Sequence, residues 1–183
     1  MQEPIFAPSN LEAYTKILDN ATVKSLEEWA IDGKNTDAWH STKKFKILTL
    51  RLLLCIIFED ITDELIWEFH DLLQTWLAGF ASPHSFPIPG TLFYKAMNAK
   101  ARMENIIGEL IEDFKLRHHN IDNDENQSNK VKTSFLGRLI YGTDENGARL
   151  TDIEMKTNII FILFAGKLEI HYPNMFCICK HLK

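Results

Sequence analysis

The sequence predicts a mainly α-helical protein of about six helices with no substantial sheet. Apolar residues recur at steps of three and four along most of the chain, whereas strand-like alternation is nearly absent. Two capping patterns mark helix starts, at Ser9 with Glu12 and at Thr151 with Glu154. The 183 residues, 45% hydrophobic and 25% charged, have the composition of one ordinary globular domain.

The first half of the chain contains three predicted helices. The first begins after Ser9 and continues to a turn at residues 31–35. The second lies within residues 47–60; it is apolar on most of its circumference, so we expect it in the core. The third, within residues 60–80, has one apolar and one polar side and ends near Gly79.

The second half begins with a segment that cannot be helical, because three prolines fall within residues 82–90. We expect this loop to be packed down by its aromatic and aliphatic residues. A long helix follows, then a polar surface loop at 118–130, a short helix at 134–142, and a last helix opened by the Thr151 cap. The apolar stripe of the long helix consists of Phe93, Ala96, Met97, Met103, Ile106, Leu110, Ile111 and Phe114.

Charge and cysteine content exclude several classes of protein. The net charge of -5 gives no reason to expect a nucleic-acid partner. Three cysteines, Cys55, Cys177 and Cys179, are too few for a disulfide framework, so a reducing compartment is expected. The N-terminus has no signal pattern, and no apolar run reaches the roughly 20 residues that span a bilayer. We therefore expect this chain alone to be cytoplasmic.

Two sets of side chains have the residue types of a metal site. The first set consists of His118, His119, Asp122 and Asp124. The second set consists of His171, Cys177, Cys179 and His181. A polar loop with loose spacing favours a solvated surface for the first set, and a single C-x-C pair is a weak metal signal for the second. His70 and His84 have no neighbour in sequence that would make either a catalytic base. We predict no metal site and no catalytic residue.

Two residues stand out within the apolar run of the second helix. Cys55 is predicted to be a small buried hydrophobic residue rather than a nucleophile. Arg51 either pairs with an acid such as Glu59 or Asp60 or points out of the core. The sequence leaves these alternatives open.

Three segments, in order and at matching spacing, resemble the middle of a cytochrome P450. PIFAPSNLEAYTKIL (4–18) is similar to the segment after the third major helix of that family. SFPIPGTLFYKAMNAKARMENIIGELIEDF (85–114) is similar to the loop and long helix of the branch that hydroxylates retinoids, sterols and plant steroid or terpenoid hormones. LTDIEMKTNIIFILFAG (150–166) resembles the start of the long helix that crosses the core over the haem.

The resemblance implies a haem-thiolate monooxygenase fold, with haem as cofactor, a lipophilic substrate and electrons from a reductase. The parent protein would be held at the endoplasmic reticulum membrane. Residues 159–164 would line the substrate pocket, and Ala165 and Gly166 would lie over the haem because neither has a bulky side chain. The alternative for the same residues is tight helix packing without a ligand, in a non-enzymatic helical partner-binding module or a pseudoenzyme.

The sequence departs from the family pattern after Gly166. The family continues with any residue, an acid and a threonine, but this chain has Lys167, Leu168 and Glu169, so Glu169 is not assigned the acid role. The glycine-rich loop with the haem-ligand cysteine is also missing. We therefore predict a partial P450 domain at 1–166 and a divergent tail at 167–183, from a truncated gene model, a retained intron or a splice variant. This chain alone is expected to be inactive and poorly soluble.

Overall fold

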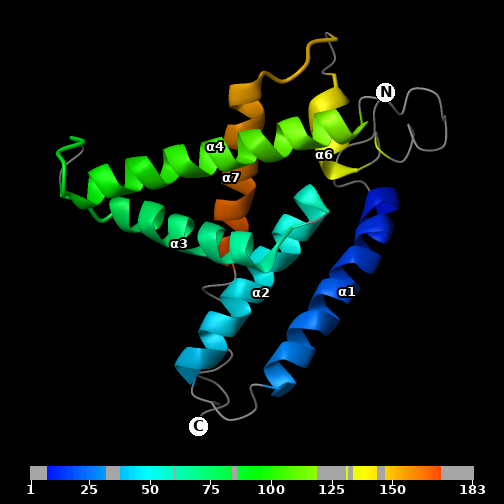
Figure 1. Ribbon diagram of the computed structural model, residues 1–183, viewed down its shortest axis with the longest axis horizontal. Coiled ribbons are helices and arrows are strands. Elements are labelled where there is room, and N and C mark those ends of the chain that lie inside the picture. The colour runs from blue at the N-terminus through cyan, green and yellow to red at the C-terminus, as the bar shows by residue number, and fades with distance from the viewer. Residues whose placement is uncertain are drawn as a thin grey trace. The chain divides into compact units, whose positions relative to one another are not determined.

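The computed structural model describes residues 8–31, 38–59, 61–83, 86–118, 131, 134–143 and 147–169. All regular structure in these ranges is helical, which confirms the predicted fold class (Figure 1). The helices are α1 (Pro8–Ile31), α2 (Ala38–Phe58), α3 (Asp63–Gly79), α4 (Leu92–His118), α6 (Phe135–Tyr141) and α7 (Asp152–Glu169). The Ser9 and Glu12 side chains, the turn after Ile31 and the polar segment 119–130 lie outside the described residues.

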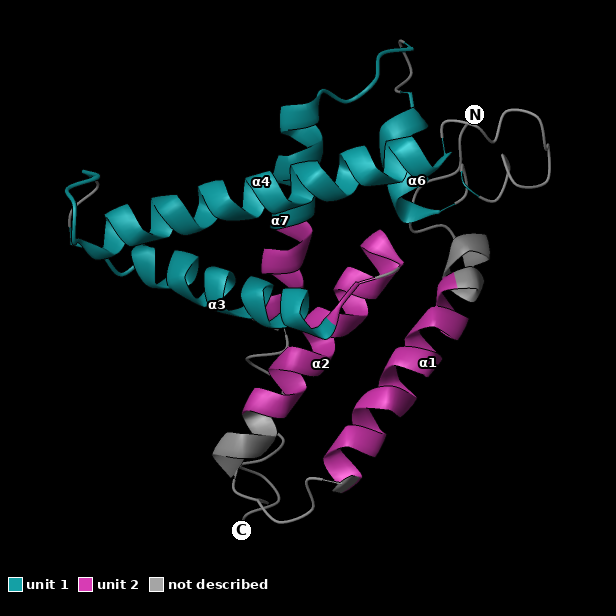
Figure 2. Ribbon diagram, viewed as in Figure 1, with its two compact units in different colours: residues 1–2, 63–160 teal, residues 3–62, 161–183 magenta. Residues whose placement is uncertain are grey.

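The chain divides into two compact units (Figure 2). Unit 1 consists of residues 1–2 and 63–160, and unit 2 of residues 3–62 and 161–183. The first half of α7 therefore belongs to unit 1 and its second half to unit 2. None of the described helices combines the length and apolar character needed to cross a membrane.

Unit 1 is built around α3 and α4, which run side by side as a hairpin (Figure 1). Their apolar sides face each other because Ile66, Phe69 and Leu73 recur at helical spacing on α3, and each is at most 1% exposed. The two backbones come close where Gly79 meets Ala96, since a Cβ at Gly79 would overlap the Ala96 methyl group. The predicted amphipathic helix ending at Gly79 is confirmed.

The buried stripe of α4 differs in part from the predicted one. Met97 is 43% exposed, so its predicted place in the stripe is wrong. Ala99 and Ile107, which the sequence analysis did not assign to the stripe, are buried. The apolar pattern located the helix correctly. It predicted the direction of the buried side only to within about one residue, which is roughly 100° around the helix axis.

A proline-glycine turn leads into α4. The Thr91 backbone N–H donates to the Ile88 carbonyl at 3.1 Å, and Gly90 has φ 90°, which closes a type II turn that favours glycine at this position. The Thr91 hydroxyl then caps α4 by accepting from the Tyr94 backbone N–H at 3.2 Å. The loop itself is not packed down as predicted, because Phe86 is 72% exposed and Ile88 is 54% exposed.

The short helix α6 begins as the sequence predicts. The Ser134 hydroxyl accepts a hydrogen bond from the Gly137 backbone N–H at 3.1 Å, which satisfies a free donor of the first turn. Phe135, Leu136 and Leu139 of this helix are buried. These contacts fix a helix too short to be stable alone in water.

Unit 2 contains α1 and α2, joined by a buried polar contact. The Arg51 guanidinium on α2 donates to the Ser25 hydroxyl at 3.0 Å and to the Glu28 carboxylate at 3.1 Å, both on α1. Arg51 therefore points inward. Glu59 is a residue after α2 with φ 61°, a left-handed conformation that ends helices and usually favours glycine.

Candidate functional site

A capping box fixes the start of α7, the helix that carries the predicted cofactor-facing residues. The Glu154 carboxylate accepts hydrogen bonds from the Thr151 backbone N–H and hydroxyl, both at 2.8 Å. The Glu154 backbone N–H donates to the Thr151 hydroxyl at 3.3 Å. The bond from the Thr151 backbone, followed by the bond from its hydroxyl, lowers the pKa of Glu154 from its usual value. The predicted capping box is confirmed.

Charged side chains hold the first half of α7 against α4 within unit 1. Lys115 Nζ lies 3.0 Å from Glu112 Oε1 and 3.4 Å from Asp152 Oδ1. The hydrogen bond to Glu112 outweighs partial burial and, with the attraction of Asp152, raises the pKa of Lys115. Lys156 Nζ lies 2.8 Å from the place that a Cβ would take at Gly108. Gly108 therefore leaves room for Lys156 to lie across α4.

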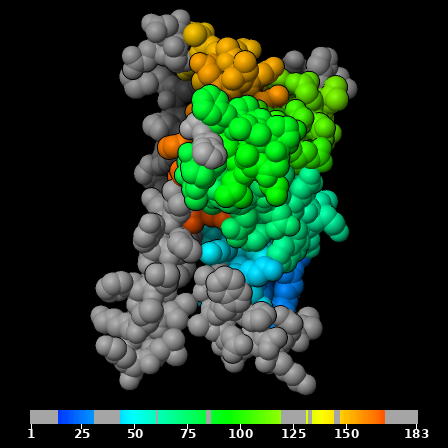
Figure 3. All heavy atoms as spheres, turned by 90° about the vertical axis from the view of Figure 1, so that its left-hand side faces the viewer, coloured from blue at the N-terminus to red at the C-terminus, as the bar shows by residue number. Residues whose placement is uncertain are grey.

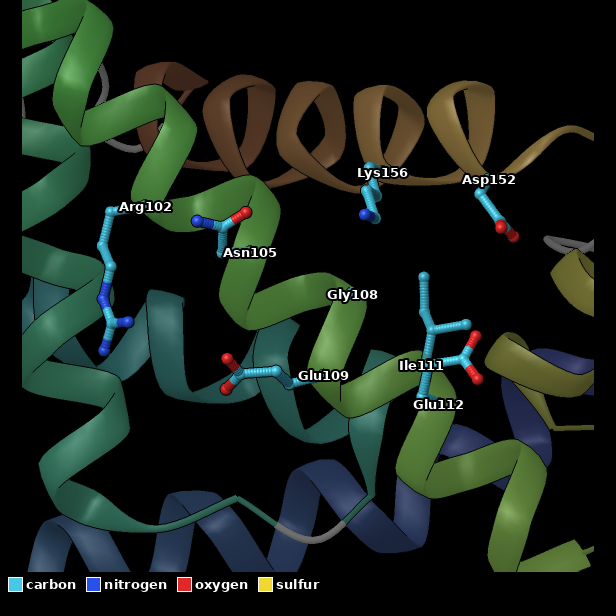
Figure 4. Close-up of a pocket in the computed structure, with 8 residues that line it drawn as sticks. All are labelled: Arg102, Asn105, Gly108, Glu109, Ile111, Glu112, Asp152 and Lys156. Atoms are coloured by element: carbon cyan, nitrogen blue, oxygen red, sulfur yellow. The ribbon is translucent and has the colours of Figure 1, made fainter.

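A groove of about 430 Å³ lies beside these contacts, between α4 and the start of α7 (Figure 4). Its lining residues are Arg102, Asn105, Gly108, Glu109, Ile111, Glu112, Asp152 and Lys156. The volume is within the roughly 300–1,000 Å³ of small-molecule sites, but such sites are mostly apolar. Five of the eight lining residues are charged, so the groove does not suit a lipophilic molecule. It includes neither Ala165 nor Gly166.

On the surface of unit 1, α4 and the start of α7 are again neighbours. In the space-filling view, the green atoms of α4 lie in the upper middle and adjoin the orange atoms at the start of α7 (Figure 3). The exposed side of α4 includes Arg102, which pairs with Glu68 of α3 at 2.9 Å.

The second half of α7 has two different sides. Leu163 is fully buried, whereas Phe161 is 64% exposed. Ala165 and Gly166 are both half-buried. Successive residues of an α-helix differ by about 100° in direction, and residues three or four apart share a side. Ala165 therefore shares the side of Phe161, and Gly166 shares the side of Leu163.

Gly166 lies against α2 within unit 2. A Cβ at Gly166 would overlap the Cδ1 methyl group of Leu53 and would lie 3.4 Å from Leu53 Cγ. The space that the missing side chain leaves is thus filled by α2. This supports the packing alternative for Gly166, and it leaves Ala165 as the less constrained residue of the pair.

The histidine and cysteine that the sequence singled out in the first half of the chain lie in helices. His70 is 5% exposed, and its Nδ1 lies 3.0 Å from Asp71 Oδ1, a partner that the sequence analysis missed. The Asp71 side chain is 81% exposed, so this pair is open to solvent on one side and does not form a closed catalytic group. Cys55 is half-buried on α2, less enclosed than the sequence predicts.

Within the described ranges, no group of three or more His, Cys, Asp or Glu side chains could hold a metal ion. Of the first candidate set, His118 is described, and its ring packs on Phe114 with the ring centroids 4.4 Å apart. His119, Asp122, Asp124, His84 and all members of the second set lie outside the described residues.

The chain matches known proteins along most of its length, although no family model matches it. Abscisic acid 8'-hydroxylase 1 of Oryza sativa subsp. japonica is 26% identical over 164 residues, which cover 88% of this chain and 30% of that protein. The 7,8-epoxymelianol synthase CYP88A154 of Ailanthus altissima is 26% identical over 175 residues, 96% of this chain and 33% of that protein. The structure of retinoic acid bound cyanobacterial CYP120A1 matches with a TM-score of 0.66 and 23% identity, over 88% of this chain and 33% of that one. The chain is similar in sequence to part of these cytochrome P450 proteins, and it has the fold of part of one of them.

The matches cover nearly all of this chain but only part of each relative. The chain spans about a third of the length of the P450 relatives, but they cover nearly all of the chain. The P450 resemblance that the three sequence segments predicted is confirmed, as is the helical P450 fold. The boundary predicted at Gly166 stays a prediction.

A P450 fold implies a haem, and the residues of α7 fit that group unequally. Gly166 leaves no open space for a flat macrocycle, because Leu53 fills it. Ala165 has a small side chain and shares the side of the exposed Phe161. Ala165 thus fits a contact with a planar cofactor, whereas Gly166 does not.

Proposed function

We propose that this chain is the part of a haem-thiolate monooxygenase that contains the helix lying over the haem. The observation that carries the proposal is the match of almost the whole chain to plant P450s, one of which is named as a hydroxylase. The P450 fold of the described residues supports it. The activity belongs to the longer protein, since this chain spans about a third of its relatives.

In that protein, α7 would supply shape rather than reacting groups. Bound haem supplies the activation of O2. Ala165 would let the α7 backbone come close to the haem plane because its side chain is a single methyl group. Phe161, on the same side, would offer an aromatic surface to an apolar substrate and exclude water. No proton-transfer role is assigned to Glu169.

The same comparison supports a proposal for the substrate class. The matched proteins are named for abscisic acid and for 7,8-epoxymelianol, and the matched structure is named as bound to retinoic acid. We propose a lipophilic substrate of the terpenoid, retinoid or sterol kind for the longer protein. A reductase would supply its electrons, and the endoplasmic reticulum membrane would be its location.

The chain alone is proposed to be inactive. Haem-thiolate chemistry needs a cysteine ligand to the iron. Cys55, the cysteine that the structure describes, lies in the middle of α2 and lacks the glycine-rich loop that the resemblance requires. Iron ligation would have to come from residues of the longer protein.

The test is the absorption spectrum of the longer protein after reduction and exposure to carbon monoxide. A Soret band at the position that gives the family its name is expected there, and no such band is expected for the 183-residue chain mixed with hemin. The same spectrum without that band in the longer protein would refute the monooxygenase. A non-enzymatic helical module or a pseudoenzyme would then be the better account.

A further inference from the structure

We propose that Gly166 is a positioning residue that seats α7 on α2 at Leu53, and that it makes no contact with haem. Of the pair that the sequence treats as one cofactor-binding unit, Ala165 alone would face the cofactor. The packing part of this inference stands on the structure of unit 2, and the haem part rests on the proposed function.

The contact with Leu53 explains why this position of α7 is a glycine. Any Cβ at Gly166 would enter the volume of the Leu53 Cδ1 methyl group. Leu53 Cγ and Cδ2 lie 3.4 and 3.5 Å from the same point, at van der Waals contact, so three carbons of the leucine lie close to it. Leu53 is half-buried within α2, and the two helices can approach only because one of them lacks a side chain here.

The burial along α7 gives the same orientation independently. Leu163 is 0% exposed and lies three residues before Gly166, on the same side of the helix. Phe161 is 64% exposed and lies four residues before Ala165, on the same side as that residue. Among the described residues, α2 occupies the side of Gly166, whereas the side of Ala165 carries the exposed Phe161.

The orientation has a consequence for the proposed haem site. A side chain added at Gly166 would push α7 away from α2 and move Ala165 with it. The effect on haem would therefore be indirect, and it would disappear if the obstructing methyl group of Leu53 were removed. A direct haem contact by Gly166 would not respond to Leu53 in this way.

Urea unfolding of the complete 183-residue chain, kept soluble by a carrier protein and followed by pulse proteolysis, tests the packing. Gly166→Ala is expected to lower the urea midpoint by about 0.5 to 1 M, as overpacking does. In the Leu53→Ala background, the same Gly166→Ala change is expected to give no further lowering. Equal lowering in both backgrounds would overturn the proposal.

Gly108→Ala is the matched control. A Cβ there would meet only the end of the flexible Lys156 side chain, which can move aside. We expect a change in midpoint much smaller than that of Gly166→Ala, and no dependence on Leu53. A loss as large as that of Gly166→Ala would show that any added methyl group on these helices destabilises the chain, and would remove the support for a specific contact.

The Soret spectrum of the longer protein tests the haem part. Gly166→Ala should reduce haem occupancy or shift the band, and Leu53→Ala should restore it. A defect that Leu53→Ala leaves unchanged would contradict the positioning role and indicate direct contact. A longer protein with no haem at all would refute the proposed function, while the urea experiment would still decide the packing role.

Discussion

The two helix pairs of this chain contain the same type of ion pair in opposite surroundings. Between α3 and α4, Arg102 pairs with Glu68 at 2.9 Å, with the side chains 52% and 39% exposed. Between α1 and α2, Arg51 pairs with Glu28 at 3.1 Å, and the Arg51 side chain is only 7% exposed. Solvent weakens the first pair, whereas the second has a cation withdrawn from water that depends on its partners.

The difference shows which interactions stabilise each pair. The α3 and α4 pair relies on apolar side chains that are almost wholly buried, so its ion pair adds little. The α1 and α2 pair has Ser25 and Arg51 in its interior. Its apolar contacts are thus joined by a buried polar contact, whose loss would leave polar groups without partners.

The largest effect is expected in the apolar pair. Leu73→Ala removes a fully buried side chain and should lower the free energy of unfolding by about 3 kcal/mol. Leu116→Ala is the control, because Leu116 is 73% exposed, and it should change the value by less than about 0.5 kcal/mol. Similar urea midpoints for both variants would mean that the α3 and α4 interface is not the stable core of unit 1.

The two ion pairs allow a direct comparison of burial. Arg51→Ala should cost about 2 kcal/mol, less than a fully buried pair because Glu28 is 45% exposed. Arg102→Ala should cost at most about 0.5 kcal/mol. Urea unfolding of both variants checks this, and equal losses would contradict the distinction between the two helix pairs.

A smaller, stabilising effect is expected at the end of α2. Glu59→Gly should raise the free energy of unfolding by about 1 kcal/mol, because glycine adopts the left-handed φ of 61° without steric cost. The same change inside a helix, Glu109→Gly on α4, should lower it by about 1 kcal/mol. Shifts of the same sign in the two urea curves would refute this account of Glu59.

The smallest effect concerns the capping box of α7 and depends on pH. The pKa of Glu154 is lowered in the folded chain, so its stabilisation is present above the ordinary value of 4.5 and is lost as the pH falls through the lower folded value. Glu154→Gln should therefore destabilise the chain at neutral pH, and the difference from the unaltered chain should shrink in acid. A difference that is constant over this pH range would count against the charged capping box.

Local features were the part of the fold that the sequence could predict. The capping box at Thr151 was predicted because its residues are three positions apart and their spacing is visible in the chain. The cap at Ser134 and the turn at Gly90 are equally local, although they were found only in the structure. The partner of Arg51 could not be predicted, because Ser25 and Glu28 are 26 and 23 positions away, on another helix. Long-range pairing depends on how helices pack, which no local pattern encodes.

The candidate site, too, could be predicted only as far as local sequence patterns allow. The sequence located Ala165 and Gly166 on the last helix, and the structure places that helix over Asp152–Glu169. The sequence alone could not assign the two residues to different sides of a packed helix, because that requires knowing where Leu53 lies. The two small residues look equivalent in sequence, and only the packing on α2 separates them.

The central claim is that this chain is part of a haem-thiolate monooxygenase. Sequencing full-length transcripts across the codons for Gly166 and Lys167 tests it most directly. The account predicts reads that continue from Gly166 into an acidic residue and a threonine, and later into a glycine-flanked cysteine. Reads that all end after Lys183 would contradict it, and would favour a pseudoenzyme or a partner-binding helical module.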